Sequence, residues 1–192
     1  MPPAWSDWAS HLKELVSLDG AAPILVGYSA STVLAAELAT MLSTRAVIFL
    51  DGNIPPPQGP VRPGSDRLRQ RVSGLAKKDG SLPLWSEWWS TEEEKTEIGI
   101  AALARDPVAF ERFRLDQPQF TLSWFDDAID LKSWGHAPAG YIQLSKYFDQ
   151  EMSEAEQRGW PTRHIMGTHL HPTLDPSQTA EAIIEVAKRL LD

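Results

Sequence analysis

The sequence predicts an α/β fold: a mostly parallel sheet with flanking helices and a helical lid inserted into it. Short apolar runs bounded by turn residues alternate with helical patterns, as in folds built from β-α-β units. The first two apolar runs, at 23–27 and 45–50, are separated by one helical segment, which indicates parallel strands. A long segment at 59–135 then shows broken helical periodicity before the apolar runs resume.

The first predicted element is a helix at about 4–18, because its apolar residues recur at three- and four-residue steps. The run at 23–27 is apolar throughout and lies between breakers, which is typical of a strand buried on both faces. A sharp Gly27-Tyr28-Ser29 corner follows, and an alanine-rich helix continues to about residue 42. The second buried strand is predicted at 45–50.

Beyond the insertion, the sequence predicts strands at 140–144 and 162–166, with a short polar helix at 150–159 between them. A closing helix begins at Asp175-Pro176-Ser177. The aspartate is suited to cap the N-terminus of this helix, and the proline is suited to its first turn. Its apolar face consists of Ala180, Ile183, Ile184, Ala187, Leu190 and Leu191. We expect one domain over 1–192, with the lid at about 59–135, because 192 residues form one sizeable core more readily than two.

Composition and net charge exclude several classes of partner and of catalytic mechanism. The formal net charge of −8 argues against nucleic acid or an anionic membrane as a partner and favours a small apolar substrate. The absence of cysteine excludes disulfides, a thiolate nucleophile and a cysteine zinc site. The first 19 residues are acidic and rich in tryptophan rather than basic and apolar, so we predict no signal peptide and expect a cytoplasmic protein.

The pentapeptide Gly27-Tyr28-Ser29-Ala30-Ser31 has the small-x-Ser-x-small pattern of a nucleophile elbow between a buried strand and a helix. Small residues are needed two positions before and after the serine because the strand and helix backbones approach closely there. The helix N-terminus points at Ser29, so the Ala30 N–H is the predicted oxyanion donor. The alternative is a plain turn in which Ser29 or Ser31 caps the helix.

A serine nucleophile needs a base, and the chain has five histidines. His11 lies on the first helix, His136 in a loop and His164 inside a strand, so structural roles are expected for all three. His169 and His171 lie between the last strand and the last helix, where a base would stand above the carboxyl ends of the strands.

A carboxylate must orient the imidazole. Asp149 follows the third predicted strand by five residues, and Asp51, the alternative acid, follows the second strand directly. His169 and His171, with His164 and Asp175, resemble a scattered set of metal ligands. Because Asp175 caps a departing helix, we predict no metal site and no cofactor.

From about Trp5 onward the chain resembles small bacterial α/β-hydrolase-fold proteins, with a strand-Ser-helix elbow, a Pro-Pro loop after an aspartate, a helical lid and a Gly-x-His-Leu-His loop. The matching segments are Ile24 to Ser31, Val47 to Pro57, Leu82 to Trp89, Tyr141 to Asp149 and Gly159 to Pro176. The resemblance implies that Ser29 is the nucleophile, Asp149 the acid and His169 the base, in the chain order of this family. His171 stays an alternative base.

Two features depart from that family. Position 31 is serine, where the elbow usually has glycine. The family also places several strands before the elbow strand, and a loop after one of them donates a second oxyanion N–H. Here one predicted helix precedes it, so the fold looks N-terminally shortened and the elbow strand would have an unpaired edge. Three explanations are open: a homodimer at that edge, a partner chain that supplies the missing strands, or a truncated reading of a longer gene.

The insertion is rich in tryptophan, and two interpretations are open. Tyr28, Trp85, Trp88 and Trp124 are predicted to line a site for an apolar acyl substrate under the lid. Trp89 could line the lid with them. Packing anchors are the alternative, which we favour for most of the tryptophans because indoles bury large areas.

The leading functional prediction is a serine hydrolase that cleaves an ester, thioester or lactone through an acyl-enzyme. A non-hydrolytic elimination or cyclisation enzyme is the first alternative, because one fold hosts both chemistries. A catalytically inert binding or assembly homologue is the second, favoured by the shortened front of the fold.

Overall fold

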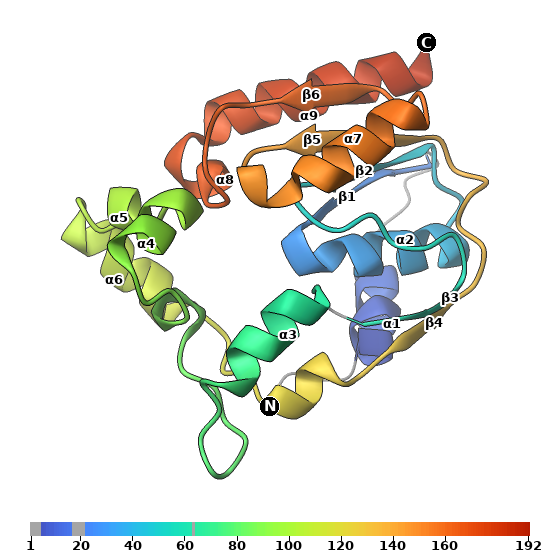
Figure 1. Cartoon of the computed structure of the whole chain (residues 1–192). Helices are drawn as coiled ribbons and strands as arrows, with labels where there is room; N and C mark the ends of the chain where they lie inside the picture. The colour runs from blue at the N-terminus through green and yellow to red at the C-terminus, as the bar shows by residue number, and fades with distance from the viewer. Residues whose placement is uncertain (1–4, 17–21, 63) are drawn as a thin grey trace.

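The computed structural model describes residues 5–16, 22–62 and 64–192 (Figure 1). Its main sheet has four strands in the order β1-β2-β5-β6, and every neighbouring pair is parallel. The strands are β1 (Ile24–Tyr28), β2 (Ala46–Leu50), β5 (Ala139–Gln143) and β6 (Thr162–His164). The predicted mostly parallel sheet is confirmed, and each strand lies within two residues of the apolar run that predicted it.

Helices cover both faces of this sheet. Alternating side chains of β2 divide between the two faces, so that Val47 and Phe49 join one buried cluster and Ile48 and Leu50 the other. The first cluster also receives α2 (Thr32–Met41) and α7 (Asp149–Gln157). The second receives α9 (Pro176–Leu191), which packs on β2, β5 and β6.

Strand β1 is less buried than its apolar sequence predicts. It is an edge strand, and the Val26 side chain is 41% exposed. The reason is that α9 lies over the three other strands and leaves this face of β1 partly open, while α2 packs on the opposite face. Within the described part of the chain, β2 is the strand that pairs with β1.

The segment between β2 and β5 is mainly helical, as predicted, but it also contains a small antiparallel sheet. Strand β3 (Gly59–Val61) pairs with β4 (Ile129–Leu131) and brings the two ends of the insertion together. Between them lie α3 (Asp66–Ser73), α4 (Glu92–Ile98), α5 (Ile100–Leu103), α6 (Pro107–Leu115) and the 3-10 turns at Trp85–Glu87 and Leu122–Phe125. Strands of three residues carry too little alternation to be predicted from sequence.

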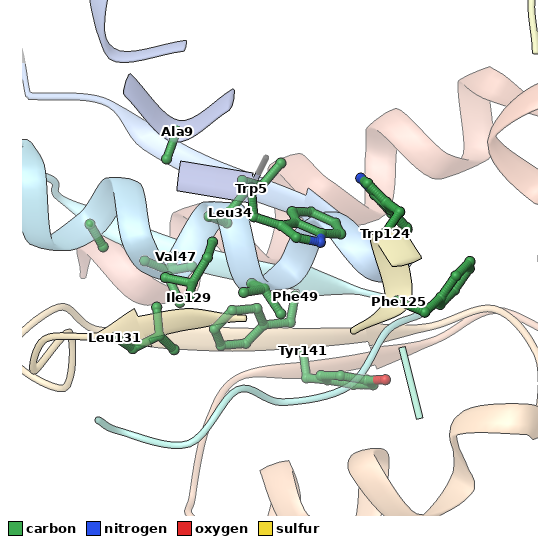
Figure 2. Packing of buried hydrophobic residues seen from close by; sticks show 14 of the residues in the cluster. Trp5, Ala9, Leu34, Val47, Phe49, Trp124, Phe125, Ile129, Leu131 and Tyr141 are labelled. Carbon is green, nitrogen blue, oxygen red and sulfur yellow. The ribbon is translucent and has the colours of Figure 1, made fainter. Parts of the chain in front are cut away.

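The larger apolar cluster is continuous from the sheet into the insertion (Figure 2). Helix α1 (Trp5–Leu15) anchors it, because Trp5 is buried with its ring centroid 4.4 Å from that of Trp124. Phe49 of β2 packs edge-on against Trp134, whose indole N–H donates to the Pro56 carbonyl at 2.8 Å. Sheet, first helix and insertion therefore share one core.

Two further features differ from the sequence predictions: the end of the first helix and the loop before the last helix. The first helix ends at Leu15, and the predicted extension through 17–18 lies outside the described residues. A short helix, α8 (His171–Leu174), forms in the loop before α9 and begins with Pro172 in its first turn. Among the described helices, none is long and apolar enough to cross a bilayer.

Candidate active site

Ser29 occupies a sharp turn between β1 and the 3-10 turn η1 (Ser29–Ser31), which leads into α2. Its φ of 56° is in the left-handed region, a strained conformation for a residue with a side chain. The strain is imposed by close packing on both sides. A Cβ added to Gly27 would lie 2.7 Å from the Thr32 Cα, and one added to Gly52 would lie 2.3 Å from the Ser29 carbonyl oxygen. The glycines therefore allow the predicted elbow.

The hydrogen bonds of the Ser31 hydroxyl explain why a serine is suited to the position two residues after Ser29. Its hydroxyl donates to the Tyr28 carbonyl at 2.7 Å and accepts from the Tyr28 N–H at 2.8 Å. These two bonds close the turn around Ser29. Ser31 makes no side-chain capping bond to α2, so the predicted capping role is not seen, and the Ser29 hydroxyl is left for another partner.

That partner is His169, whose Nε2 lies 2.9 Å from Ser29 Oγ. The histidine sits in the loop between β6 and α8 and is 5% exposed. His171, the alternative base, contacts Gln178 instead, with 2.7 Å between its Nε2 and the amide oxygen. His164 is exposed at the end of β6. Of the candidate bases, the structure brings His169 to Ser29.

The structure brings Asp51, not Asp149, to the other side of the imidazole. Asp51 Oδ2 is 2.7 Å from His169 Nδ1, and the carboxylate is fully buried. Because a carboxylate accepts, this contact assigns the proton to Nδ1 and leaves Nε2 free to accept from Ser29. Asp149 lies exposed in the first turn of α7, where Gln143 Nε2 donates to it.

The backbone explains how Asp51 reaches the histidine. It directly follows β2 with a φ of 44°, and β5 is the next strand in the sheet. The N–H groups of Leu144 and Ser145, just beyond β5, donate to Asp51 Oδ1 at 2.7 and 2.8 Å. The Ser145 hydroxyl donates to Oδ2 at 2.8 Å. Asp51 is the alternative acid predicted from sequence, whereas Ser145 was not predicted because it carries no motif of its own.

Aromatic rings surround the imidazole. The Tyr28 ring stacks on it at 4.9 Å between centroids, and Phe148 and Trp85 lie at 5.8 and 6.1 Å. Of the predicted substrate-lining residues, Tyr28 and Trp85 are thus near the site. Trp88 and Trp124 are 2% and 8% exposed and pack on aromatic neighbours in the core, as the packing interpretation expects.

The insertion touches the site through α4. The Leu170 N–H, next to His169, donates to the Ile98 carbonyl at the end of α4 at 3.0 Å. Glu97 forms an ion pair with Lys146 and accepts from the Tyr147 hydroxyl at 3.1 Å. Lys146 and Tyr147 follow directly after Ser145, so the same loop holds both the acid and the insertion.

Burial raises the pKa of two tyrosines near Asp51. It raises the pKa of Tyr141 above the ordinary value, with the Asp51 charge adding to the effect. The Tyr141 hydroxyl stays a donor and binds the Gly52 carbonyl at 2.9 Å, which fixes the turn that carries Asp51. Burial likewise raises the pKa of Tyr28, and the Asp51 charge again contributes.

Other features of the described chain do not converge on this site. Its histidine, aspartate and glutamate side chains include no group of three placed to hold a metal ion. A cavity of about 350 Å³ lies between α1 and the end of α2, away from Ser29. Its lining residues are Ser10, Lys13, Glu14 and Met41.

A sequence model of the Alpha/beta hydrolase family matches residues 1–182. The chain belongs to this family. The resemblance to α/β-hydrolases found in the sequence is thereby confirmed, and membership supports a hydrolase-type function.

Solved structures with the same fold include tomato methylketone synthase I in complex with 2-tridecanone, at a TM-score of 0.68 and 14% identity. Polyneuridine aldehyde esterase matches at 0.63 and 12%, and a pyrethroid hydrolase from Sphingobium faniae JZ-2 at 0.61 and 14%. The matches cover 98, 96 and 97% of this chain and 80, 80 and 79% of those chains, respectively. At these identities the likeness concerns the fold. The comparison with curated proteins found no match.

Proposed function

We propose that this α/β-hydrolase is a serine hydrolase that cleaves an ester, thioester or lactone through an acyl-enzyme on Ser29. The observation that carries the proposal is the continuous path from Ser29 Oγ to His169 at 2.9 Å and from His169 to Asp51 at 2.7 Å. Nucleophile, base and orienting acid thus have the mutual contacts that acyl transfer needs. The structure supports Asp51 as the acid in place of Asp149.

In the proposed reaction, His169 Nε2 takes the Ser29 proton while Oγ attacks the substrate carbonyl carbon. The resulting tetrahedral oxyanion accepts a hydrogen bond from the Ala30 N–H, at the start of the helical segment after the elbow. The oxyanion then collapses, and the leaving oxygen or sulfur takes the proton from Nε2. Water repeats the sequence on the acyl-enzyme and releases the acid. Asp51 keeps the imidazole oriented in both halves.

Ala30 is the oxyanion donor that the elbow supplies. The loss of one oxyanion hydrogen bond costs about 100- to 1000-fold in turnover. A site that uses Ala30 alone would therefore turn over slowly by that factor, and acylation of Ser29 by a reactive probe would remain measurable. Acylation is accordingly the first reaction to test.

The proposed substrate has an apolar acyl part. Trp85 and Phe148 present aromatic surface near His169, and apolar walls favour apolar acyl groups. The tomato synthase of the same fold binds 2-tridecanone, a long apolar ketone. The insertion that carries Trp85 would act as the lid that excludes water during the reaction.

A second candidate is a non-hydrolytic reaction on the same scaffold, such as elimination or cyclisation. The likeness to a methylketone synthase favours it, because that printed name denotes a synthase rather than a hydrolase. In such a reaction His169 would move a proton without an acyl-enzyme. Ser29→Ala would then retain activity, whereas the hydrolase would lose it.

The deciding experiment is labelling of the purified protein with a fluorophosphonate, followed by mass spectrometry to locate the adduct. We expect one adduct on Ser29 and none in Ser29→Ala, with circular dichroism used to show that both proteins are folded. A Ser73→Ala control, at an exposed serine of α3, retains both the nucleophile and the turn around it. No adduct in the folded protein would contradict the hydrolase proposal and would favour the inert binding homologue.

A further inference from the structure

Tyr28 contacts His169 through both its ring and its hydroxyl. The ring stacks on the imidazole with centroids 4.9 Å apart and planes 29° apart. The hydroxyl donates to the His169 backbone carbonyl. One side chain on β1 therefore holds the main chain of a histidine that lies 141 residues later. Its hydroxyl is occupied by this bond, and a substrate-lining role for Tyr28 stays a prediction.

Tyr28 is itself fixed by the elbow. Its N–H and its carbonyl are both hydrogen bonded to the Ser31 hydroxyl, at 2.8 and 2.7 Å. Residue 28 also immediately precedes Ser29, so any shift of its backbone moves the nucleophile. The side chain thus links the position of Ser29 directly to the position of His169.

The surroundings of His169 make a stacked ring useful. The histidine is 5% exposed, so water can do little to stabilise a positive charge on it. A base that takes a proton from Ser29 becomes an imidazolium, and aromatic faces attract cations. Asp51 lies at the ring edge, at Nδ1, whereas Tyr28 covers a face of the ring. The two groups therefore act on different sides of the imidazole.

We propose that Tyr28 is a positioning residue for His169, whose hydroxyl holds the histidine backbone and whose ring stabilises the protonated imidazole. This inference rests on the proposed function in so far as His169 is the base. The hydroxyl remains a donor over the working pH range because burial raises the pKa of Tyr28 above its ordinary value. Two separate effects follow, and two variants distinguish them.

The ring is tested by titration of His169, observed by NMR in the folded protein and assigned with His169→Gln. Tyr28→Leu removes the ring, so the protonated imidazole loses a stabilising face and the titration midpoint should fall by about 0.5 to 1.5 pH units. Tyr28→Phe keeps the ring and should leave the midpoint within about 0.3 units of wild type. Asp51 and Tyr28 are the ionisable side chains in contact with the imidazole, and both variants keep Asp51.

Phe113→Leu is the matched control for loss of a ring. Phe113 packs on Trp85 in the insertion, at 6.1 Å between centroids, and its ring is not one of those that surround His169. The control should leave the midpoint unchanged. A Tyr28→Leu midpoint equal to that of wild type, in folded protein, would overturn the role of the ring whether or not the protein hydrolyses esters.

The hydroxyl is tested by kinetics of Ser29 labelling with the fluorophosphonate. Tyr28→Phe loses the bond to the His169 carbonyl, and the labelling rate should fall by about 3- to 30-fold because the base is less well held. Ser73→Ala removes an exposed hydroxyl on α3 that also donates to a backbone carbonyl, that of Arg69, and its labelling rate should stay within about twofold. A wild-type rate for Tyr28→Phe would overturn the role of the hydroxyl. Failure of wild type to label would instead contradict the hydrolase proposal and leave the titration result standing.

Discussion

The Asp51 carboxylate receives hydrogen bonds from the Leu144 N–H, from the N–H and hydroxyl of Ser145, and from His169 Nδ1. A carboxylate accepts through two oxygens, and here both are occupied by donors from neighbouring parts of the sheet edge. Full occupancy fixes the orientation of the group. The side chain therefore orients the imidazole rather than moving with it.

Replacement of the two candidate acids separates their roles. Asp51→Asn should lower kcat for ester hydrolysis by about 10,000-fold, because an amide can present its NH₂ to Nδ1 and favour the wrong tautomer. Asp149→Asn should change kcat by less than about threefold, since the residue is exposed and bound by Gln143. The measurement is steady-state kinetics on an activated ester. Equal losses in the two variants would contradict the assignment of Asp51.

Sequence alone identified Ser29 and His169 as candidates because local patterns mark them, an elbow pentapeptide and a loop after the last strand. It could not choose the acid for a physical reason. Asp51 is selected by N–H groups 93 and 94 residues away, and those groups are placed by the pairing of β5 with β2. The chain has 26 acidic residues, so a position shortly after a strand does not by itself distinguish the acid that orients His169 from other carboxylates.

At the scale of elements, the contact between α4 and the loop after β5 decides how firmly the insertion is held. Glu97 of α4 forms an ion pair with Lys146 and accepts a hydrogen bond from the Tyr147 hydroxyl, and both partners lie in that loop. The Glu97 side chain is 23% exposed. Burial, aided by the bond to Glu97, raises the pKa of Tyr147 to about 12, so its hydroxyl remains a donor. The Lys146 bond holds the pKa of Glu97 below the ordinary 4.5.

Glu97→Gln should loosen the insertion and raise KM about two- to fivefold, with a smaller effect on kcat. Because the pKa of Glu97 is lowered on folding, the pair stabilises the protein above about pH 4.5 and its contribution is lost as pH falls through the lowered pKa. The Tm difference between wild type and Glu97→Gln should therefore be present at pH 7 and shrink in acid.

Glu92→Gln is the matched control on the same helix. Glu92 is 84% exposed and pairs with Lys95 within α4, so it does not join the helix to the core. Its replacement should leave KM unchanged. A KM increase shared by both variants would assign the effect to the helix itself and contradict a role for the contact with the loop.

Most helices and strands of the sheet were predictable because each has a pattern of apolar residues that extends over several positions. The apolar runs predicted β1, β2, β5 and β6, and the cap and periodicity predicted α9. The face predicted for α9 was partly wrong, because Thr179, Ala182 and Val186 are its buried residues and Ala180, Ile184 and Leu191 are exposed. The small β3–β4 sheet and α8 were not predicted. Each is only three or four residues long and depends on contacts across the fold rather than on local periodicity.

For the whole molecule, the sequence predicted an unpaired strand edge, and β1 lies at the edge of the described sheet with Val26 41% exposed. What sequence could not show is that two residues of the apolar face predicted for α9 remain exposed. Ile184 and Leu191 of α9 are 53% and 40% exposed, while Ile183 and Ala187 next to them pack in the same cluster as Ile24. An edge strand with unpaired backbone groups and an exposed apolar side chain, here Val26, favours association.

We therefore predict that the protein self-associates through β1, and that Val26→Lys shifts it toward the monomer because a charge on an edge strand opposes strand addition. Size-exclusion chromatography with light scattering, over a range of protein concentrations, measures this directly. Val108→Lys is the control, since Val108 is an exposed valine, at 80%, on α6 in the insertion and should leave the assembly unchanged. Added salt should strengthen the wild-type assembly by screening the repulsion between copies that each carry a net charge of −8. A wild-type protein that stays monomeric at all concentrations and salt levels would show that the β1 edge does not drive self-association.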